Sequence, residues 1–236
     1  MIKIYGKNCI YAAIHANSKI EKIYISNEIS KKDKHIIDLL NDKGYKYNIC
    51  DKAYLDKEFG DGHQGYAAIR FDYDIKDESY LDNINKENGR ILILDGIQDP
   101  HNLGAIIRSV DAFSFDLIIL PKNRSVSINK TVAHVSTGAI EYVNIMYVNS
   151  LNNIVNKLKK LNYWICGTDA SGDTLAENID KSLNLALIIG SEGFGMSKTL
   201  VKESDYLLTI PMTGHVNSLN ASVSCGIFLK DLAKNK

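Results

Sequence analysis

Three separated segments in the second half of the chain combine polar, charged and glycine residues in patterns that could bind a ligand. They are residues 102–109 (Asn-Leu-Gly-Ala-Ile-Ile-Arg-Ser), 189–196 (Ile-Gly-Ser-Glu-Gly-Phe-Gly-Met) and 217–222 (Asn-Ser-Leu-Asn-Ala-Ser). Each follows an apolar, strand-like run or lies at the expected start of a helix, where open α/β sheets present ligand-binding groups. Because the three segments occur in order in one chain, we predict that they form one composite site.

The second segment has the features of a ligand-binding loop between a strand and a helix. Residues 185–189 (Leu-Ala-Leu-Ile-Ile) predict the strand, and the glycines after it allow close approach of the backbone to a ligand and exposure of N–H groups. The sequence lacks both the G-x-G-x-x-G spacing of dinucleotide sites and the G-x-x-x-x-G-K-[ST] phosphate loop. The alternative interpretation is a tight turn with a solvated Glu192.

The first and third segments offer side chains whose roles the sequence leaves open. Arg108 follows apolar neighbours on a predicted helix, which indicates a largely buried helix in which an arginine needs a specific partner. A surface or ion-paired arginine is the alternative. Asn102 lies near the expected start of this helix and could cap it. Ser218 and Asn220 open the last predicted helix, where ordinary helix caps would look the same.

Composition places the chain among globular proteins of the cytoplasm. Its 236 residues include 28 basic and 28 acidic side chains, so net charge indicates no polyanionic partner, although a local basic patch could still steer one. The cysteines at 9, 50, 166 and 225 form no C-x-x-C pair, which favours free thiols in a reducing compartment. No apolar run approaches the ~20 residues that cross a bilayer, and the N-terminus has no signal-peptide pattern.

Residues 1–73 predict a compact unit of helices and strands. Residues 74–89 are polar and charge-dense, as in a linker with one short helical turn. Within the first unit, helices are predicted at residues 7–15, 32–43 and 52–59, and strands at residues 20–25, 45–50 and 66–71.

Strands and helices then alternate regularly through residues 90–236, which predicts an α/β domain. The predicted strands are residues 91–94, 117–120, 163–167, 185–189 and 206–210. The predicted helices are residues 103–113, 129–138, 151–161, 197–203 and 219–232. The strands are short, continuous apolar runs, which is typical of a parallel sheet covered by helices on both faces.

Taken together, the three segments resemble the motifs of the SpoU (TrmH) family of RNA ribose 2′-O-methyltransferases, within the SPOUT superfamily. The motifs are matched in order and spacing by residues 99–109, 187–196, and 210–212 with 217–224. Residues 5–10 (Tyr-Gly-Lys-Asn-Cys-Ile) and 62–68 (Gly-His-Gln-Gly-Tyr-Ala-Ala) resemble the ends of the L30e-like domain that many members carry.

This resemblance implies a fold, a reaction and partners. The expected fold is a SPOUT α/β knot, a parallel sheet with a C-terminal trefoil knot, preceded by a small L30e-like α/β domain. The expected domains are an L30e-like RNA substrate-binding domain at 1–73, a linker at 74–89 and a methyltransferase domain at 90–236. The expected donor is S-adenosylmethionine without a metal. The expected substrate is a guanosine ribose in the peptidyl-transferase region of 23S ribosomal RNA, and a homodimer with no membrane association is implied.

The site residues of the family carry over one by one. Its catalytic positions fall on Arg108, Asn102, Glu192, Ser218 and Asn220. Its donor-binding positions fall on Gly190, Ile210, Leu219 and Met212. We expect Arg108 to stabilise the developing alkoxide and the adjacent phosphate, because a guanidinium stays charged and forks onto oxygens. Asn102 and Glu192 would orient Arg108, whereas Ser218 and Asn220 would fix the ribose or the loop of the site.

Three other functions stay open at this stage. A non-catalytic RNA-binding protein with a decayed methyltransferase domain is disfavoured by the complete set of site residues. The same chemistry on tRNA, or on a different ribosomal nucleotide, would leave the site unchanged. A nicotinamide-dependent Rossmann enzyme is disfavoured by the missing phosphate fingerprint. Lys7, Asn8, Arg124 and Lys130 are candidates for the surface that faces RNA.

Overall fold

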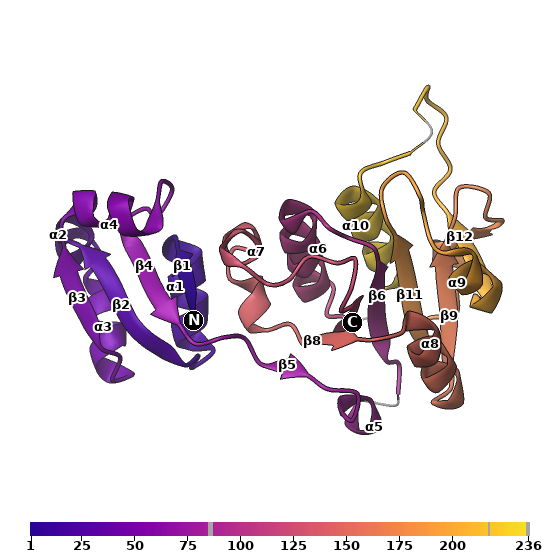
Figure 1. Cartoon of the computed structure of the whole chain (residues 1–236), viewed down its shortest axis with the longest axis horizontal. Coiled ribbons are helices and arrows are strands. Elements are labelled where there is room, and N and C mark those ends of the chain that lie inside the picture. The colour runs from indigo at the N-terminus through magenta and orange to yellow at the C-terminus, as the bar shows by residue number, and fades with distance from the viewer. Residues whose placement is uncertain (85–86, 217, 235–236) are drawn as a thin grey trace. The chain divides into compact units, whose positions relative to one another are not determined.

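The computed structural model describes residues 1–84, 87–216 and 218–234, and the chain divides into two compact units. Unit 1 consists of Met1–Tyr73 and Ile128–Tyr142, and unit 2 of Asp74–Ser127 and Val143–Lys236. Each unit has its own sheet (Figure 1). Within the described ranges, no helix has the length and apolar character required to cross a membrane.

Unit 1 contains a four-stranded mixed sheet in the order β1-β4-β2-β3. Strand β4 pairs antiparallel with β1 and β2, whereas β3 pairs parallel with β2. The strands are β1 (Ile2–Tyr5), β2 (Ile20–Ser26), β3 (Tyr47–Cys50) and β4 (Tyr66–Arg70). The helices between them are α1 (Lys7–His15), α2 (Asn27–Lys32), α3 (Lys34–Asp42) and α4 (Lys52–Phe59).

Strand alternation separates two small cores on the faces of this sheet. Ile23 and Ile25 of β2 lie in one core with Ile10, Ile14, Ile36 and Leu40 of helices α1 and α3. Tyr24, which points to the other face, packs with Leu55 and Phe59 of α4. The predicted helices at 7–15 and 52–59 are confirmed, whereas the predicted helix at 32–43 begins at Lys34 because Asp33 caps α3 and accepts a hydrogen bond from Ile36 N.

A segment distant in sequence completes unit 1. Helix α7 (Lys130–Val135) and the 3-10 turn at Ala139–Glu141 belong to this unit. The rings of His134 and Tyr5 stack with centroids 4.3 Å apart, and the Cys9 thiol donates to the Ala133 carbonyl at 3.5 Å. Arg70 forms an ion pair with Glu141, and the side chains are only 6% and 3% exposed. Removing either charge would leave the other buried without its partner.

Unit 2 is built on an eight-stranded sheet in the order β10-β12-β9-β11-β6-β7-β8-β5, and every neighbouring pair is parallel. The strands along the chain are β5 (Ile75–Lys76), β6 (Arg90–Asp95), β7 (Leu117–Pro121), β8 (Ile145–Val148), β9 (Tyr163–Thr168), β10 (Thr174–Leu175), β11 (Asn184–Gly190) and β12 (Tyr206–Thr209). The prediction of a parallel α/β sheet is confirmed. The trefoil knot stays a prediction.

Helices cover both faces of this sheet (Figure 1). They are α5 (Tyr80–Asn83), α6 (Pro100–Ala112), α8 (Leu151–Lys160), α9 (Lys198–Glu203) and α10 (Ala221–Leu232), with a 3-10 turn at Ala176–Asn178. Ile91 and Ile93 of β6 share a core with α8 and α9. The alternate residues Leu92 and Leu94 are also fully buried, and their side chains point to the opposite face, where α6 packs against α10.

The strand order reverses between β6 and β11, which are adjacent although β7, β8, β9 and β10 intervene in sequence. Strands β7 and β8 extend the sheet to one side of β6, whereas β9 and β12 lie beyond β11. Parallel sheets bind ligands in the crevice outside the carboxyl ends of the strands at such a reversal. Strands β6 and β11 end at Asp95 and Gly190. The fold therefore predicts a ligand site at the residues that follow them.

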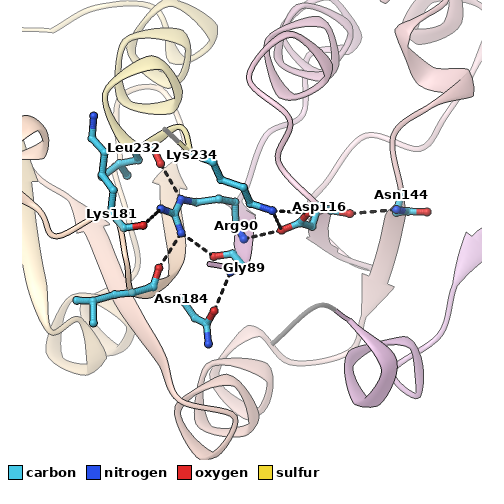
Figure 2. A network of polar contacts seen from close by, with 9 residues as sticks. Gly89, Arg90, Asp116, Asn144, Lys181, Asn184, Leu232 and Lys234 are labelled. Atoms are coloured by element: carbon cyan, nitrogen blue, oxygen red, sulfur yellow. Dashed lines mark hydrogen bonds and ion pairs between the residues drawn. The ribbon is translucent and has the colours of Figure 1, made fainter. Parts of the chain in front are cut away.

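A buried arginine joins the start of β6 to the C-terminal end of the chain (Figure 2). Arg90 is 0% exposed, and its guanidinium donates to four carbonyl oxygens: Leu232 at 2.7 Å, Gly89 at 3.1 Å, Leu183 at 2.7 Å and Lys181 at 2.7 Å. Burial lowers the pKa of Arg90, and nearby Asp116 opposes this shift. The same Asp116 accepts from Arg90 N and forms an ion pair with Lys234, so the start of β6 and the residues after α10 meet in one polar network.

Several strands were not predicted from the sequence. Strand β8 lies between the predicted elements, and β5 with the one-turn helix α5 lies inside the predicted linker. Strands β1, β5, β8 and β10 have only two to four residues each, so their apolar patterns are too short to stand out. They are stabilised by pairing with longer strands that are distant in sequence, and the local sequence does not reveal this pairing.

Candidate active site

One carboxylate oxygen connects the three segments singled out in the sequence. Glu192 Oε1 accepts hydrogen bonds from Asn102 Nδ2 at 3.0 Å, Asn220 Nδ2 at 2.6 Å and Ala221 N at 3.0 Å. Asn220 Nδ2 also donates to Asn102 Oδ1 at 3.0 Å. Since Asn102 lies on α6, Glu192 after β11 and Asn220 before α10, this cluster fixes three elements against one another. The prediction that the segments come together is confirmed for these three residues.

The loop after β11 is a tight turn. Ser191 N donates to the Gly195 carbonyl at 3.1 Å, and Gly195 N donates back to the Ser191 carbonyl at 3.0 Å. Where this turn closes, the backbone at Gly195 and Met196 comes so near Gly190 that a Cβ there would lie 2.2 Å from Gly195 C. Only glycine fits at position 190, because any side chain would collide with the backbone of the same loop. The contact of Gly190 with a donor stays a prediction.

The third segment forms the entrance to α10. Asn220 caps this helix, and its Oδ1 accepts from Ser222 N at 2.9 Å and from Val223 N at 3.4 Å. The cap interpretation is therefore correct for Asn220, and its amide nitrogen in addition contacts Glu192. Its role in the reaction stays a prediction. Asn217 lies outside the described residues.

Three expectations for the first segment are wrong. Asp99, not Asn102, caps α6, because its Oδ1 accepts from His101 N at 3.0 Å and Pro100 occupies the first helical turn. Asn102 is instead buried at 9% exposure with its amide turned to Glu192. Arg108 is exposed, although six other residues of α6 are buried, and it has no ion-pair partner within the described part of the chain. Asn102 and Glu192 bond to each other and not to Arg108.

The first cavity opens on the β12 side of the 191–195 loop and has a volume of about 720 Å³. All four predicted donor-binding residues line it, namely Gly190, Ile210, Leu219 and Met212. Glu192, Ser218 and Asn220 line it as well. Sequence reasoning missed Thr168, Asp169 and Phe228, which also line the cavity. The first two could have been found, because they follow the predicted strand at 163–167 as polar residues at the same sheet edge.

A second cavity of about 590 Å³ lies at the carboxyl end of β6 and the start of α6. Gln98, Asp99, Asn102 and Arg124 line it, and Phe194 borders it from the 191–195 loop. The residues common to both cavities are Ser191, Glu192, Phe194 and Gly195. The 191–195 loop therefore separates two adjoining cavities, and the site has room for two ligands side by side.

The cysteines have the character of structural thiols. None is in a disulfide, and Cys9, Cys166 and Cys225 are buried whereas Cys50 is half-buried. Burial raises the pKa of Cys9 to about 11 and that of Cys166 to about 12, and it raises the pKa of Cys225 as well. A thiol whose pKa is raised carries almost no thiolate at neutral pH and is a poor nucleophile. The described residues bring no three His, Cys, Asp or Glu side chains together as metal ligands.

Two family models match this chain. The model described as the SpoU rRNA Methylase family matches residues 89–230, and the model described as RNA 2'-O ribose methyltransferase substrate binding matches residues 3–75. A Staphylococcus aureus protein named for the TrmH family of tRNA/rRNA methyltransferases is 39% identical over 238 aligned residues, covering 99% of this chain and 96% of the relative. A Staphylococcus haemolyticus protein of the same name is 38% identical over 100% of this chain and 96% of its own length.

Solved structures share the fold. The SpoU methyltransferase AviRb from Streptomyces viridochromogenes, in complex with the cofactor AdoMet, superposes with a TM-score of 0.81 at 22% identity and covers 98% of this chain and 88% of its own. An AdoMet-bound rRNA methyltransferase from Sinorhizobium meliloti gives 0.80 at 22% identity, with 98% and 86% covered. The TrmH/SpoU tRNA modifying enzyme of A. aeolicus gives 0.55 at 26% identity and covers 62% of this chain and 76% of its own.

Proposed function

The chain belongs to the SpoU rRNA methylase family of RNA methyltransferases, and from this premise we propose that it transfers a methyl group from S-adenosylmethionine to a ribose 2′-oxygen of ribosomal RNA. The observation that carries the proposal is the Glu192 cluster at the boundary of two cavities. A transferase needs two binding sites whose ligands meet, and the 191–195 loop borders both.

The first cavity fits S-adenosylmethionine in size and in chemistry. Its volume of about 720 Å³ lies in the usual range of ligand sites. Ile210, Leu219 and Phe228 give it an apolar wall suited to an adenine ring, whereas Asp169 and Glu192 give it carboxylates suited to the positive charges of the donor. When bound, the donor supplies a methyl group on a sulfonium, which is already a good leaving group. The proposed contacts are made by Gly190, Ile210, Leu219 and Met212.

The residues of the chain then have to align the ribose and favour its oxyanion. We assign the second task to Arg108, whose permanent charge and forked donors suit an alkoxide and a neighbouring phosphate. Asn102, Glu192 and Asn220 hold the loop and the start of α10 in place through their mutual hydrogen bonds. We assign contact with the ribose to Ser218, which is exposed and lines the first cavity. Alignment of two reactants contributes ~7–11 kcal/mol in favourable cases.

Replacing Glu192 by alanine is expected to weaken S-adenosylmethionine binding about tenfold or more, because hydrogen bonds to a charged group contribute ~1.5–3 kcal/mol. Two of its three hydrogen bonds hold Asn220 and Ala221 in the wall of the first cavity, and the third holds Asn102. Calorimetric titration measures the change. Glu192→Gln is the matched control, since its amide oxygen keeps an acceptor and should lose less. Unchanged donor affinity in Glu192→Ala would contradict the anchoring role.

A homodimer in the cytoplasm completes the proposal. Val223 and Ile227 are exposed apolar residues one turn apart on α10, which packs against the helix that carries Arg108. A second copy of the chain would bury both. Sedimentation analysis of Val223→Asp should therefore show a shift from dimer to monomer, and a variant that stays dimeric would place the contact elsewhere.

The proposed target is a guanosine in the peptidyl-transferase region of 23S RNA. Support comes from the match of residues 3–75 to the substrate-binding model, and from the tRNA modifying enzyme of A. aeolicus, whose similarity covers only 62% of this chain. Mapping of ribose methylation in ribosomal RNA from cells with and without the protein is the direct test. Loss of one 23S guanosine methylation is expected, whereas loss in tRNA alone would contradict the target. A protein that binds RNA but not S-adenosylmethionine would be the non-catalytic alternative.

A further inference from the structure

Phe194 is an unusual surface residue. Its side chain is 94% exposed, more than any other large apolar side chain among the described residues. The turn around it is well defined, because Gly193 and Gly195 adopt positive φ angles of 84° and 65° and two backbone hydrogen bonds join Ser191 to Gly195. A rigid turn that holds a phenylalanine in water loses the gain of burying that ring. Such an arrangement indicates a ligand that covers the ring when bound.

The second cavity beside Phe194 contains a single arginine. Arg124 lines this cavity in a left-handed backbone conformation with φ 64°, which is uncommon for a residue other than glycine and is often retained at functional sites. Three carboxylates share the cavity, and each accepts hydrogen bonds: Asp95 Oδ2 from Ser197 N at 2.8 Å, Asp99 Oδ1 from His101 N at 3.0 Å, and Glu192 Oε1 from Asn102, Asn220 and Ala221. Over the described ranges Arg124 forms no ion pair, so its guanidinium is available to an anion.

We propose that the second cavity holds the acceptor nucleotide of the RNA, with the base stacked on Phe194 and a phosphate paired with Arg124. The inference rests on the proposed function and adds the residues that position the substrate. Aromatic side chains stack on any base because every base has a π-face, and a guanidinium matches phosphate oxygens with two parallel donors. A nucleotide turned out of its stack exposes these two groups together.

The position of the 191–195 loop explains how one aromatic residue would assist methyl transfer. Phe194 and Glu192 line both cavities, so a base resting on Phe194 lies at the boundary with the donor cavity. Asn102 is buried in the wall of the second cavity and donates a hydrogen bond to Glu192, which holds that part of the wall in one conformation. The cavity volume of about 590 Å³ is ample for one nucleotide.

The test for Phe194 compares two substitutions in the full-length protein. Unmethylated ribosomal RNA from cells lacking the enzyme is the substrate, with labelled S-adenosylmethionine as donor. Phe194→Ala should lower kcat/KM for RNA about tenfold or more through loss of one stacking contact, whereas the Kd for S-adenosylmethionine stays within about twofold. Phe194→Tyr should restore most of the activity, because stacking needs only an aromatic ring. Trp164→Ala, which removes an aromatic side chain lining neither cavity, is the control.

The test for Arg124 uses the salt dependence of RNA binding. Arg124→Ala should reduce the slope of log affinity against log salt concentration by about 1, because one phosphate contact is lost. Lys122→Ala is a matched control, since Lys122 is also an exposed cation but lies outside the lining of the second cavity. An equal change of slope in both variants would show that general surface charge, and not the cavity, attracts the RNA, and would overturn the assignment of Arg124.

Other outcomes separate this inference from the proposed function. Wild-type activity in Phe194→Ala would overturn the role of the ring. An equal loss of donor affinity would assign Phe194 to the first cavity, and a shift from dimer to monomer would assign it to a contact between copies. Either result overturns the inference and leaves the methyltransferase proposal intact. A wild-type protein that binds S-adenosylmethionine but methylates no ribosomal RNA overturns the proposed function, and RNA affinities of wild type and Phe194→Ala then still decide the role of the ring.

Discussion

Substitution of Arg108 by alanine should reduce methyl transfer roughly 10²–10³-fold or more, which is the usual cost of removing one donor that stabilises a developing oxyanion. The reduction should appear in kcat. Arg108 is exposed on α6 and lines neither cavity, so the unfolding temperature and the affinity for S-adenosylmethionine should stay close to wild type. Transfer of labelled methyl groups to unmethylated ribosomal RNA measures the rate, and calorimetry measures the donor affinity.

Arg108→Lys distinguishes two roles for the same residue. As an electrostatic clamp, the lysine keeps the charge but loses the fork, and it should give partial activity with an unchanged pH profile. As a general base, a lysine with an ordinary pKa near 10.4 deprotonates more readily than arginine, so the rising limb of the rate should move to lower pH. Near wild-type transfer by Arg108→Ala, with donor binding intact, would contradict both roles.

Replacement of Arg90 by methionine is expected to lower the free energy of unfolding of unit 2 by about 3 kcal/mol or more. The carbonyl oxygens of Leu232, Leu183 and Lys181, which are buried or partly buried, would lose the arginine donor, whereas Gly89 O keeps Leu185 N, and each unsatisfied buried polar group costs ~1–3 kcal/mol. Urea unfolding can be followed through Trp164, the only tryptophan, which lies on β9 of this unit. With m near 1–3 kcal/mol per M, the midpoint should fall by about 1 M or more.

The matched control for Arg90 is Lys234→Met, which removes the partly exposed partner of Asp116 in the same network. A pair of this kind contributes about 1 kcal/mol or less, so the midpoint should change little. A similar small change in Arg90→Met would show that water or neighbouring side chains satisfy the three carbonyls and that the clamp is dispensable.

The sequence predicted the location of the site better than the conformation of its side chains. Apolar runs such as residues 185–189 identify buried parallel strands, and the residues after such strands must meet at one edge of the sheet. Gly190, Ile210, Leu219 and Met212, which the family resemblance assigned to the donor, all line one cavity. Which residue at that edge stacks, caps a helix or binds a ligand depends on the conformation of the loops. No pattern in the residues around Glu192 predicts that its carboxylate accepts three hydrogen bonds.

The error on Arg108 has a different origin. The adjacent apolar residues in the sequence favour a buried arginine. On a helix, however, the buried residues recur about every 3.6 positions and are not consecutive. Leu103, Ile106, Ile107 and Val110 have the spacing of one buried stripe, and Arg108 lies outside this stripe. A helical count would have predicted an exposed arginine. The packing of α7 against the N-terminal residues of unit 1 could not be predicted at all. No pattern within residues 130–135 indicates a partner more than a hundred residues earlier in the chain.

That last contact has a consequence for protein synthesis. Unit 1 lacks the partner of Arg70 until Glu141 has left the ribosome, about 70 residues after the contiguous part ends at Tyr73. At roughly 5–20 residues per second, the nascent unit waits about 4–14 s for its last piece. We expect stalled nascent chains ending at about residue 120 to be cleaved rapidly by protease within unit 1, and chains that expose residue 142 to resist. Equal protection of both would show that residues 1–73 fold without waiting for the synthesis of residues 128–142.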